Sequence, residues 1–397
     1  MNFFKKKLKN GITVIFEKRQ LPIVALSITN KFGAAFEESK IKGISHFIEH
    51  LLFTGTKTRS SSEISREIEK KGGILNAFTA QEATSFWFKL PSEHILSGLN
   101  ILIDMLLNPL FSPEKFEKEK KVILEEIKMY HDAPQWDIFN KIETNLYESP
   151  FGEGIIGNEN TISSISREFV VKYYNANYFP SNFIVTIVGN ADFDFICNYL
   201  EEKISPIKKK DIKREKIIKI NKESFEEREG IDQAHFVFAI HAPIPSEENF
   251  FALEILDAYL ANGMSSKLFL TIREEKGLAY SVKSSINAEK SYSYYSIYVG
   301  TMKEKIDEVK KLILEGFESA ANMSEKDFKE AKERVIGLRR ISKEESVNVM
   351  NDLMSYELAE RVEDYYNEET KINAVKLEDV KNLARIKKFS TAAIVPK

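Results

Sequence analysis

The chain is 397 residues long, with 43% hydrophobic and 29% charged residues, as expected of a globular protein with more than one domain. Its 57 Lys and Arg residues nearly balance 60 Asp and Glu residues, so the charge favours neither nucleic acid nor an anionic membrane as a partner. A single cysteine, Cys197, excludes an internal disulfide framework. We find no apolar run long enough to span a membrane and no secretory signal after the first lysines, and therefore expect a cytoplasmic protein.

The first half of the chain predicts strands and helices whose order can be read from turn signals and apolar periodicity. Strands are expected at 12–16, 23–28 and 183–189, with a strand, a turn and a second strand over 74–88. Helices are expected around 45–53 and at 60–71, 93–107, 113–129, 161–175 and 193–204.

Residues 45–53, Ser-His-Phe-Ile-Glu-His-Leu-Leu-Phe, predict a short helix with metal-binding chemistry. One helical turn takes about 3.6 residues, so His46, Glu49 and His50 share one face among apolar neighbours. Two imidazoles at this spacing can chelate one Zn²⁺, and the carboxylate between them can take a proton from the water that the metal activates. The order His-x-x-Glu-His is a zinc-peptidase signature. The alternative, two surface histidines beside an acid, is disfavoured because the chain has only 6 His.

A catalytic zinc needs a third protein ligand, and the long helix expected at 113–129 offers acidic candidates. Glu119 and Glu126 are seven residues apart, so they share a face of this helix. For Glu125 we take the alternative interpretation, a position on a solvated charged face. Spacing alone does not choose between Glu119 and Glu126.

The composition changes near the middle of the chain. Residues 208–216 form a charged run that is poor in core residues, which predicts an exposed linker. A nucleic-acid patch is disfavoured there because no aromatic residues are interleaved. We therefore expect a first domain at 1–204, a linker at 205–224 and a second domain at 225–397.

The second half repeats the order of elements of the first. Strands are expected at 233–241, 279–288 and 292–301, and helices at 250–260, from 265 onward, at 303–320 and at 325–341. Sliding the second half back by 208 residues places Gly263 on Gly55. The same offset places Glu254 and Ala258 where the two histidines lie, so the second half is predicted to be a duplicate without a metal site.

Four motifs together resemble the pitrilysin–insulinase–mitochondrial processing peptidase family of zinc metallopeptidases, and most of all its short-subunit bacterial branch. The resemblance covers nearly the whole chain. The first two motifs are His46-x-x-Glu49-His50 and the acidic segment that ends in Glu125-Glu126. The other two are Gly72-Gly73-x-x-Asn76-Ala77-x-Thr79-x-x-Glu82-x-Thr84 and Arg273-Glu274-Glu275-Lys276-Gly277-Leu278-Ala279-Tyr280-Ser281.

The resemblance implies roles at the metal. His46, His50 and Glu126 would hold Zn²⁺, and Glu119 would support the site from close by. Glu49 would accept a proton from water and later pass it to the leaving amine.

It also implies how a peptide would bind. Asn76 and Ala77 would lie on an edge strand to which an extended substrate adds as a further strand. Arg273 would bind a substrate carbonyl, and Tyr280 would stabilise the oxyanion as it forms. Without the resemblance, Tyr280 would be interpreted as a packed strand aromatic and Arg273 as a surface helix residue.

The architecture implied is α+β, with two tandem homologous domains, each a mixed, mostly antiparallel sheet with helices packed on one face. One chain holds both the zinc motif and the Arg273–Tyr280 pair, so a homodimer could serve itself, while a heterodimer with a sister subunit stays open. Two chains would enclose a chamber that admits peptides and excludes folded proteins. The expected partners are extended peptide substrates, with neither nucleic acid nor membrane.

The function expected is that of a zinc metalloendopeptidase acting on unfolded peptides or presequences. The alternative is a non-catalytic scaffold or chaperone-like subunit of a peptidase-like assembly. Family members of that kind usually lose part of His-x-x-Glu-His, whereas this chain keeps all of it, which favours the peptidase. The ligand types favour zinc over Mn²⁺ or Co²⁺.

Overall fold

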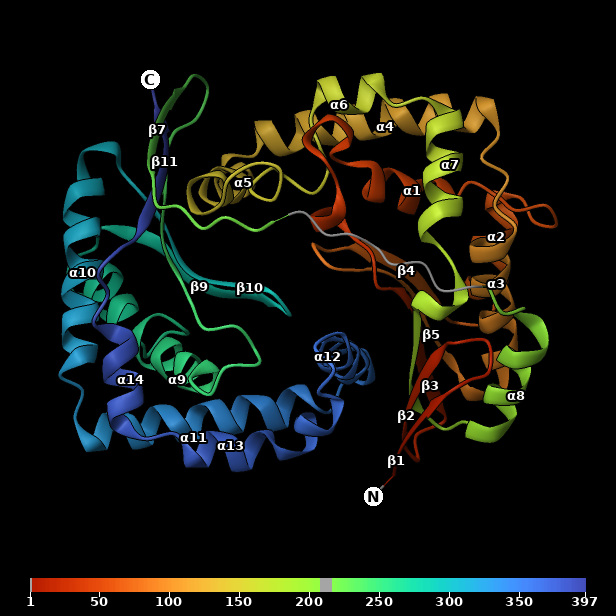
Figure 1. Ribbon diagram of the computed structural model, residues 1–397. Helices are drawn as coiled ribbons and strands as arrows, with labels where there is room; N and C mark the ends of the chain where they lie inside the picture. The colour runs from red at the N-terminus through yellow and green to blue at the C-terminus, as the bar shows by residue number, and fades with distance from the viewer. Residues whose placement is uncertain (1, 208–215) are drawn as a thin grey trace. The chain divides into compact units, whose positions relative to one another are not determined.

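The computed structural model describes residues 2–207 and 216–397 and divides into two compact units (Figure 1). Each unit holds one mixed sheet with helices, of 6 and 5 strands, which confirms the predicted α+β class with two sheets. Unit 1 consists of Met1–Ile127, Gly154–Glu215 and Ser342–Val362, and unit 2 of Lys128–Glu153, Lys216–Ile341 and Glu363–Lys397. The units therefore exchange segments across the linker expected at 205–224. Most of the charged run at 208–216 lies outside the described residues.

The sheet of unit 1 has the strand order β1-β2-β6-β3-β5-β4. All neighbouring strands are antiparallel except β2 and β6, which run parallel. Among the described residues β4 pairs only with β5, so β4 is an edge strand. The strands are β1 (Phe3–Lys7), β2 (Thr13–Lys18), β3 (Ile23–Asn30), β4 (Ile74–Thr79), β5 (Thr84–Pro91) and β6 (Phe183–Gly189).

Helices with apolar inner faces cover one side of this sheet and enclose the core of unit 1. They are α1 (Ile44–Leu52), α2 (Ser61–Glu69), α3 (Ile95–Leu107), α4 (Pro113–Asp132), α6 (Glu159–Ser164), α7 (Arg167–Asn177) and α8 (Phe193–Lys203). The prediction of a single helix at 161–175 is wrong, because this stretch forms two helices, α6 and α7, with a non-helical link between them. Ser166 starts the new helix, since its hydroxyl accepts a hydrogen bond from the backbone N–H of Phe169.

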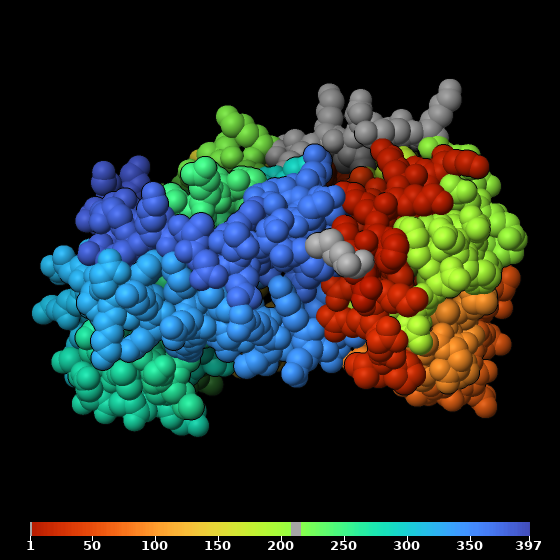
Figure 2. Space-filling view, turned by 90° about the horizontal axis from the view of Figure 1, so that it is seen from below, coloured from red at the N-terminus to blue at the C-terminus, as the bar shows by residue number. Residues whose placement is uncertain are grey.

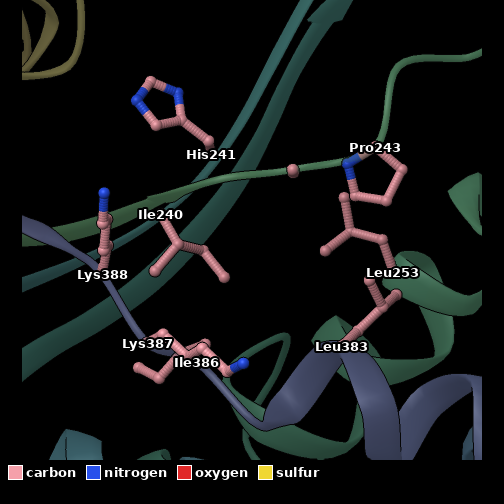
Figure 3. Close-up of a pocket in the computed structure, with 9 residues that line it drawn as sticks. Ile240, His241, Pro243, Leu253, Leu383, Ile386, Lys387 and Lys388 are labelled. Atoms are coloured by element: carbon pink, nitrogen blue, oxygen red, sulfur yellow. The ribbon is translucent and has the colours of Figure 1, made fainter. Parts of the chain in front are cut away.

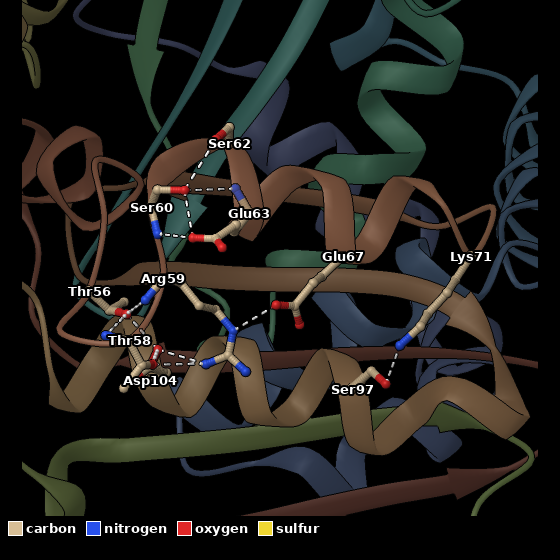
Figure 4. A network of polar contacts seen from close by, with 10 residues as sticks. All are labelled: Thr56, Thr58, Arg59, Ser60, Ser62, Glu63, Glu67, Lys71, Ser97 and Asp104. Carbon is tan, nitrogen blue, oxygen red and sulfur yellow. Dashed lines mark hydrogen bonds and ion pairs between the residues drawn. The ribbon is translucent and has the colours of Figure 1, made fainter.

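A polar network fixes the segment between α1 and α2 onto α3 (Figure 4). One Asp104 carboxylate oxygen accepts hydrogen bonds from Thr56, Thr58 and Arg59, at 2.6–2.7 Å. Ser60 and Glu63 form a capping box that begins α2. These contacts hold the chain before α2 and anchor the turn that leaves α1.

The other face of the unit 1 sheet contacts α12 (Ser346–Leu358), a helix from the second half of the sequence. Thr29 on β3 points to this helix, and its hydroxyl lies 3.0 Å from Met354 Sδ. Near the N-terminus, Lys5 on β1 pairs with Glu357 on α12 at 2.7 Å. Figure 2 shows red residues from the start of the chain beside blue residues from its second half.

The sheet of unit 2 has the order β7-β11-β8-β10-β9, in which only β7 and β11 run parallel. The strands are β7 (Glu223–Arg228), β8 (Ala234–His241), β9 (Ala279–Glu289), β10 (Tyr292–Thr301) and β11 (Ser390–Pro396). The helices of unit 2 include α9 (Phe250–Leu260), α10 (Ile306–Ala321), α11 (Glu325–Ser342), α13 (Glu368–Ala374) and α14 (Leu377–Ala384). The helix expected from 265 onward is a short π-helical segment, Phe269–Glu275. No helix among the described residues is long and apolar enough to cross a membrane.

Helix α5 (Pro134–Leu146) comes from the first half of the sequence but packs on β8 and β11 of unit 2. The Asn145 side-chain amide donates to Ser224 Oγ at 2.7 Å and to the Thr391 carbonyl at 2.9 Å. Thus α5, from the first half of the sequence, lies on the sheet of unit 2, and α12, from the second half, lies on the sheet of unit 1.

Candidate metal centre and active site

Helix α1 is an apolar helix that carries three polar residues on one partly open face. His46 is 9% exposed, while Glu49 and His50 are partly buried. The remaining side chains hold the helix in the core because they are completely buried: Ile44, Phe47, Ile48, Leu51 and Leu52. Tight packing of one face therefore fixes the direction of the polar face.

The side chains of His46, His50 and Glu126 converge, and their ligand atoms all lie within 4.8 Å of one another. Glu126 Oε2 is 3.5 Å from His50 Nε2 and 3.8 Å from His46 Nε2. Ligands at about 2.0–2.1 Å from a tetrahedral zinc would be about 3.3 Å apart. Two imidazoles and a carboxylate at nearly this spacing fit a zinc ion.

The electrostatics of the cluster also suit a dication. Burial, together with the neighbouring His50, lowers the pKa of His46 to about 3, which keeps this imidazole in the neutral form that binds metals. Burial raises the pKa of Glu126, against the attraction of His50. A bound dication would compensate the buried carboxylate.

Glu119 lies on the other side of the His50 ring. Its Oε2 is 3.5 Å from His50 Nδ1, whereas Glu126 faces Nε2 of the same ring. Burial lowers the pKa of His50, but Glu119, Glu126 and Glu49 raise it more, and the net result is a raised pKa. The geometry thus distinguishes the two glutamates, between which sequence spacing did not choose. Glu126 joins the ligand atoms, and Glu119 takes the outer position from which carboxylates commonly orient a metal-bound histidine.

Glu49 is held by the neighbouring sheet. Its Oε2 accepts a hydrogen bond of 2.5 Å from the hydroxyl of Thr79, the last residue of β4. Burial raises the pKa of Glu49, and the Thr79 hydrogen bond opposes that rise. The sequence motif includes Thr79, but this contact depends on packing between α1 and β4, which no sequence pattern reports.

Asn76 and Ala77 lie on β4, the edge strand expected for them. Asn76 is exposed, and its side-chain oxygen accepts a 2.8 Å hydrogen bond from the Ala77 backbone N–H. This bond lies on the edge strand, whose outer side is not paired with another strand among the described residues.

Arg273 and Tyr280 lie together in unit 2. The Arg273 guanidinium stacks 5.1 Å from the centre of the Tyr280 ring and 4.8 Å from that of Phe269. Tyr280 is 79% exposed, so the interpretation of Tyr280 as a packed strand aromatic is wrong. The pair presents a cation and a phenol to solvent from the edge strand β9 and the segment before it.

In the second half, two arginines contact the positions that correspond to the two histidines of the first half. Arg339 on α11 donates to Glu254 on α9 at 2.9 Å and also pairs with Glu368. Arg334 donates to the Ala258 carbonyl at 3.1 Å, and the offset of 208 residues places Arg334 on Glu126. In the described part of the chain, the only group of three metal-ligating side chains that could share an ion is the one at α1 and α4.

Unit 2 also has a surface pocket, which Figure 3 shows in close-up. Its lining is apolar apart from Lys387, Lys388 and His241. The His241 ring points to the other side of β8 from Ile240, and its Nε2 lies 2.8 Å from the Ile220 carbonyl. The pocket therefore presents no set of metal ligands or nucleophiles.

Comparison with known proteins identifies the family. Residues 13–159 match the family model "Insulinase (Peptidase family M16)", and residues 164–335 match "Peptidase M16 inactive domain". The chain is 30% identical over 393 residues, 95% of its length and 93% of the relative's, to the uncharacterized zinc protease YmxG of Bacillus subtilis. The chain belongs to the M16 peptidase family. The family predicted from the motifs is thereby confirmed.

A further relative and two solved structures are also similar to this chain. An uncharacterized zinc protease of Rickettsia felis is 34% identical over 312 residues, 77% of this chain and 75% of the relative. A protease from Helicobacter pylori has the same fold, with a TM-score of 0.94 at 19% identity over 99% of both chains. The structure of a peptidase M16 inactive domain from Pseudomonas fluorescens gives a TM-score of 0.88 at 16% identity, over 100% of this chain and 99% of that one.

Proposed function

We propose that this M16 chain is a zinc-dependent endopeptidase that hydrolyses unfolded peptides or presequences. The observation that carries the proposal is the convergence of His46, His50 and Glu126 beside Glu49. The curated relatives named zinc proteases support it. A partly buried carboxylate beside the neutral imidazole of His46 is costly unless a cation joins them, so the cluster is better explained by function than by stability.

His46, His50 and Glu126 would hold the zinc, and Glu119 would orient His50 through Nδ1. When bound, zinc supplies Lewis acidity, which polarises a peptide carbonyl and makes water a better proton donor. Glu49 would take the proton from the attacking water and deliver it to the leaving amine nitrogen. The hydrogen bond from Thr79 would hold the Glu49 carboxylate in place for both transfers.

The substrate would bind as an added strand along β4. An edge strand offers unpaired backbone donors and acceptors, so recognition would fall on the main chain of an extended peptide. Asn76 and the backbone N–H of Ala77 would contact it, once the bond between them opens. We assign Arg273 to a substrate carbonyl and Tyr280 to the oxyanion, because Arg273 is partly exposed and Tyr280 is exposed and can donate a hydrogen bond.

We further propose that the chain works in the cytoplasm as a homodimer, or as a heterodimer with a sister subunit, that encloses the substrate in a chamber. Only extended chains would enter such a chamber. The single cysteine is compatible with a reducing compartment.

The test is to offer zinc-loaded protein a set of unstructured peptides of about 10–40 residues, a length suited to strand addition, beside a compact folded protein. Mass spectrometry of the products should show internal cleavage of the peptides and no cleavage of the folded protein. Products trimmed only from their ends would contradict an endopeptidase. Binding of peptides without any cleavage by zinc-loaded protein would favour the scaffold or chaperone-like alternative.

Thr79→Val should lower kcat about tenfold, with a smaller change in KM. A hydrogen bond to a charged group contributes about 1.5–3 kcal/mol, and we expect part of this energy to serve only to position the Glu49 carboxylate as a base. Valine has nearly the same shape as threonine but cannot donate to Glu49. Thr79→Ser keeps the hydroxyl and should retain most of the activity. Steady-state cleavage of one fluorogenic peptide by the three proteins would decide. Equal kcat values for Thr79→Val and wild type would exclude a role for this hydrogen bond.

A further inference from the structure

We propose that Glu37 is a positioning residue that fixes the start of α1 and thereby sets the affinity of the candidate centre for zinc. The inference rests on the proposed function, because it assumes that His46 and His50 bind the metal. Glu37 does not touch the ligand atoms; it acts through the backbone of the helix that carries them.

The Glu37 carboxylate caps α1 from a position six residues before the N-cap, Gly43. Glu37 is completely buried, and its Oε1 accepts from the Ser45 backbone N–H at 2.7 Å. Its Oε2 accepts from the Gly43 backbone N–H at 2.9 Å. The first backbone N–H groups of a helix lack partners within the helix, and Gly43 at the N-cap has no side chain to supply one. A buried carboxylate therefore does what a serine or aspartate at the N-cap does elsewhere.

A charged group can be buried only where its surroundings compensate the charge, and the neighbours of Glu37 do so. Lys42 is also completely buried, and it attracts Glu37 while its Nζ donates to the Ala34 carbonyl at 2.8 Å. The carboxylate also faces the positive end of the helix dipole. Glu37 thus lies in a preformed anion site made of two amides, a lysine and a helix end.

The start of α1 is also fixed from the opposite side. Gly43 has φ +96°, and a Cβ there would lie 2.6 Å from the Ile156 carbonyl oxygen. A Cβ on Gly157 would lie 2.3 Å from the Lys42 carbonyl oxygen. The two backbones pack directly against each other, so the entry to α1 has little room to move except toward Glu37.

The consequence for the metal follows from position. Ser45, which donates to Glu37, directly precedes His46, whereas the third candidate ligand, Glu126, lies on another helix. A shift of the first turn would move the imidazole relative to that carboxylate. Zinc sites tolerate only about 0.2 Å of error in ligand distance. Outer partners of metal ligands typically contribute about 10–100-fold to metal affinity, and we expect the same of Glu37.

The decisive variant is Glu37→Gln, with Glu38→Gln as matched control, since Glu38 is adjacent, exposed and paired with Lys40. Glutamine keeps the shape but replaces one acceptor oxygen with a donor that faces a backbone N–H. Zinc affinity is measured by competition with a chromophoric chelator, at a temperature where circular dichroism shows folded protein. The absorption spectrum of the Co²⁺-substituted protein reports ligand geometry. We expect zinc affinity to fall about 10–100-fold and the cobalt spectrum to change in Glu37→Gln alone.

Wild-type zinc affinity and an unchanged cobalt spectrum in folded Glu37→Gln would overturn the proposal, even if its melting temperature is lower. If Glu37→Gln does not fold, Glu37→Asp replaces it, because aspartate keeps the charge but is too short to reach both amides; wild-type zinc affinity there would equally overturn it. Neither measurement depends on peptide cleavage. If wild type binds zinc but cleaves no peptide, the endopeptidase proposal fails while the test of Glu37 stands.

Discussion

Glu49→Gln is expected to bind zinc as wild type does and to lose peptide cleavage by roughly 10²–10⁴-fold, the usual contribution of a general acid–base residue. Such a loss corresponds to about 3–5 kcal/mol of transition-state stabilisation. Glutamine still offers an oxygen to the Thr79 hydroxyl, so the fold and the position of α1 should be unchanged. However, glutamine cannot accept the proton from water and pass it to the leaving amine.

The measurement pairs metal content with kcat for one fluorogenic peptide. Glu125→Gln is the matched control, since Glu125 is exposed on α4 next to Glu126, and it should keep both zinc and activity. Cleavage at the wild-type rate by zinc-loaded Glu49→Gln would contradict the role assigned to Glu49. Loss of zinc from Glu49→Gln would instead indicate that Glu49 is itself a metal ligand.

Arg339→Met is expected to destabilise unit 2 by about 3–5 kcal/mol, near the lower end, because it removes the cation shared by two carboxylates in a mostly buried cluster. The Arg339 side chain is 25% exposed, and those of its partners Glu254 and Glu368 are 15% and 1% exposed. Arg340→Met is the control at the next position. Arg340 is 67% exposed and pairs with Glu369 at the surface, so its loss should cost less than about 1 kcal/mol.

The loss in the free energy of unfolding caused by Arg339→Met should depend on pH. Burial raises the pKa of Glu254 above its usual 4.5, and Arg339 opposes that rise. A carboxyl with a raised pKa in the folded state costs stability above that pKa, and the cost disappears below the pKa of the unfolded chain. Without Arg339 the pKa rises further. Urea unfolding at pH 7 and near pH 4.5 should therefore show a smaller difference from wild type at the lower pH, whereas a constant difference would mean that Glu254 stays neutral in both proteins.

Local patterns were sufficient to predict helix α1 and most strands. The helix at 250–260 and the strands at 183–189 and 292–301 match α9, β6 and β10, because each is a continuous apolar segment with clear ends. The His-x-x-Glu-His spacing places three side chains on one helical face whatever the tertiary fold. In contrast, the choice between Glu119 and Glu126 depends on the direction of α4 relative to α1, which the sequence alone does not contain.

Long-range packing accounts for what the sequence did not predict. Helix α5 begins with a proline at its first turn and has Ile138, Ile142 and Leu146 at helical spacing, so its existence could have been predicted. Its place on the sheet of unit 2 could not, because amphipathic periodicity says only that a face is buried, not against which sheet. Glu37 gave no signal, since its partners are backbone amides and an acidic residue beside Glu38 resembles any solvated charge pair.

The most direct test of the central claim is a zinc titration of metal-free protein, followed by cleavage of one unstructured peptide at each step. If His46, His50 and Glu126 hold the metal used for hydrolysis, cleavage should be absent at the start and reach its maximum at one zinc per chain. His50→Ala should show neither tight zinc binding nor cleavage over the same range. Full cleavage by the metal-free protein, or by His50→Ala, would contradict the claim.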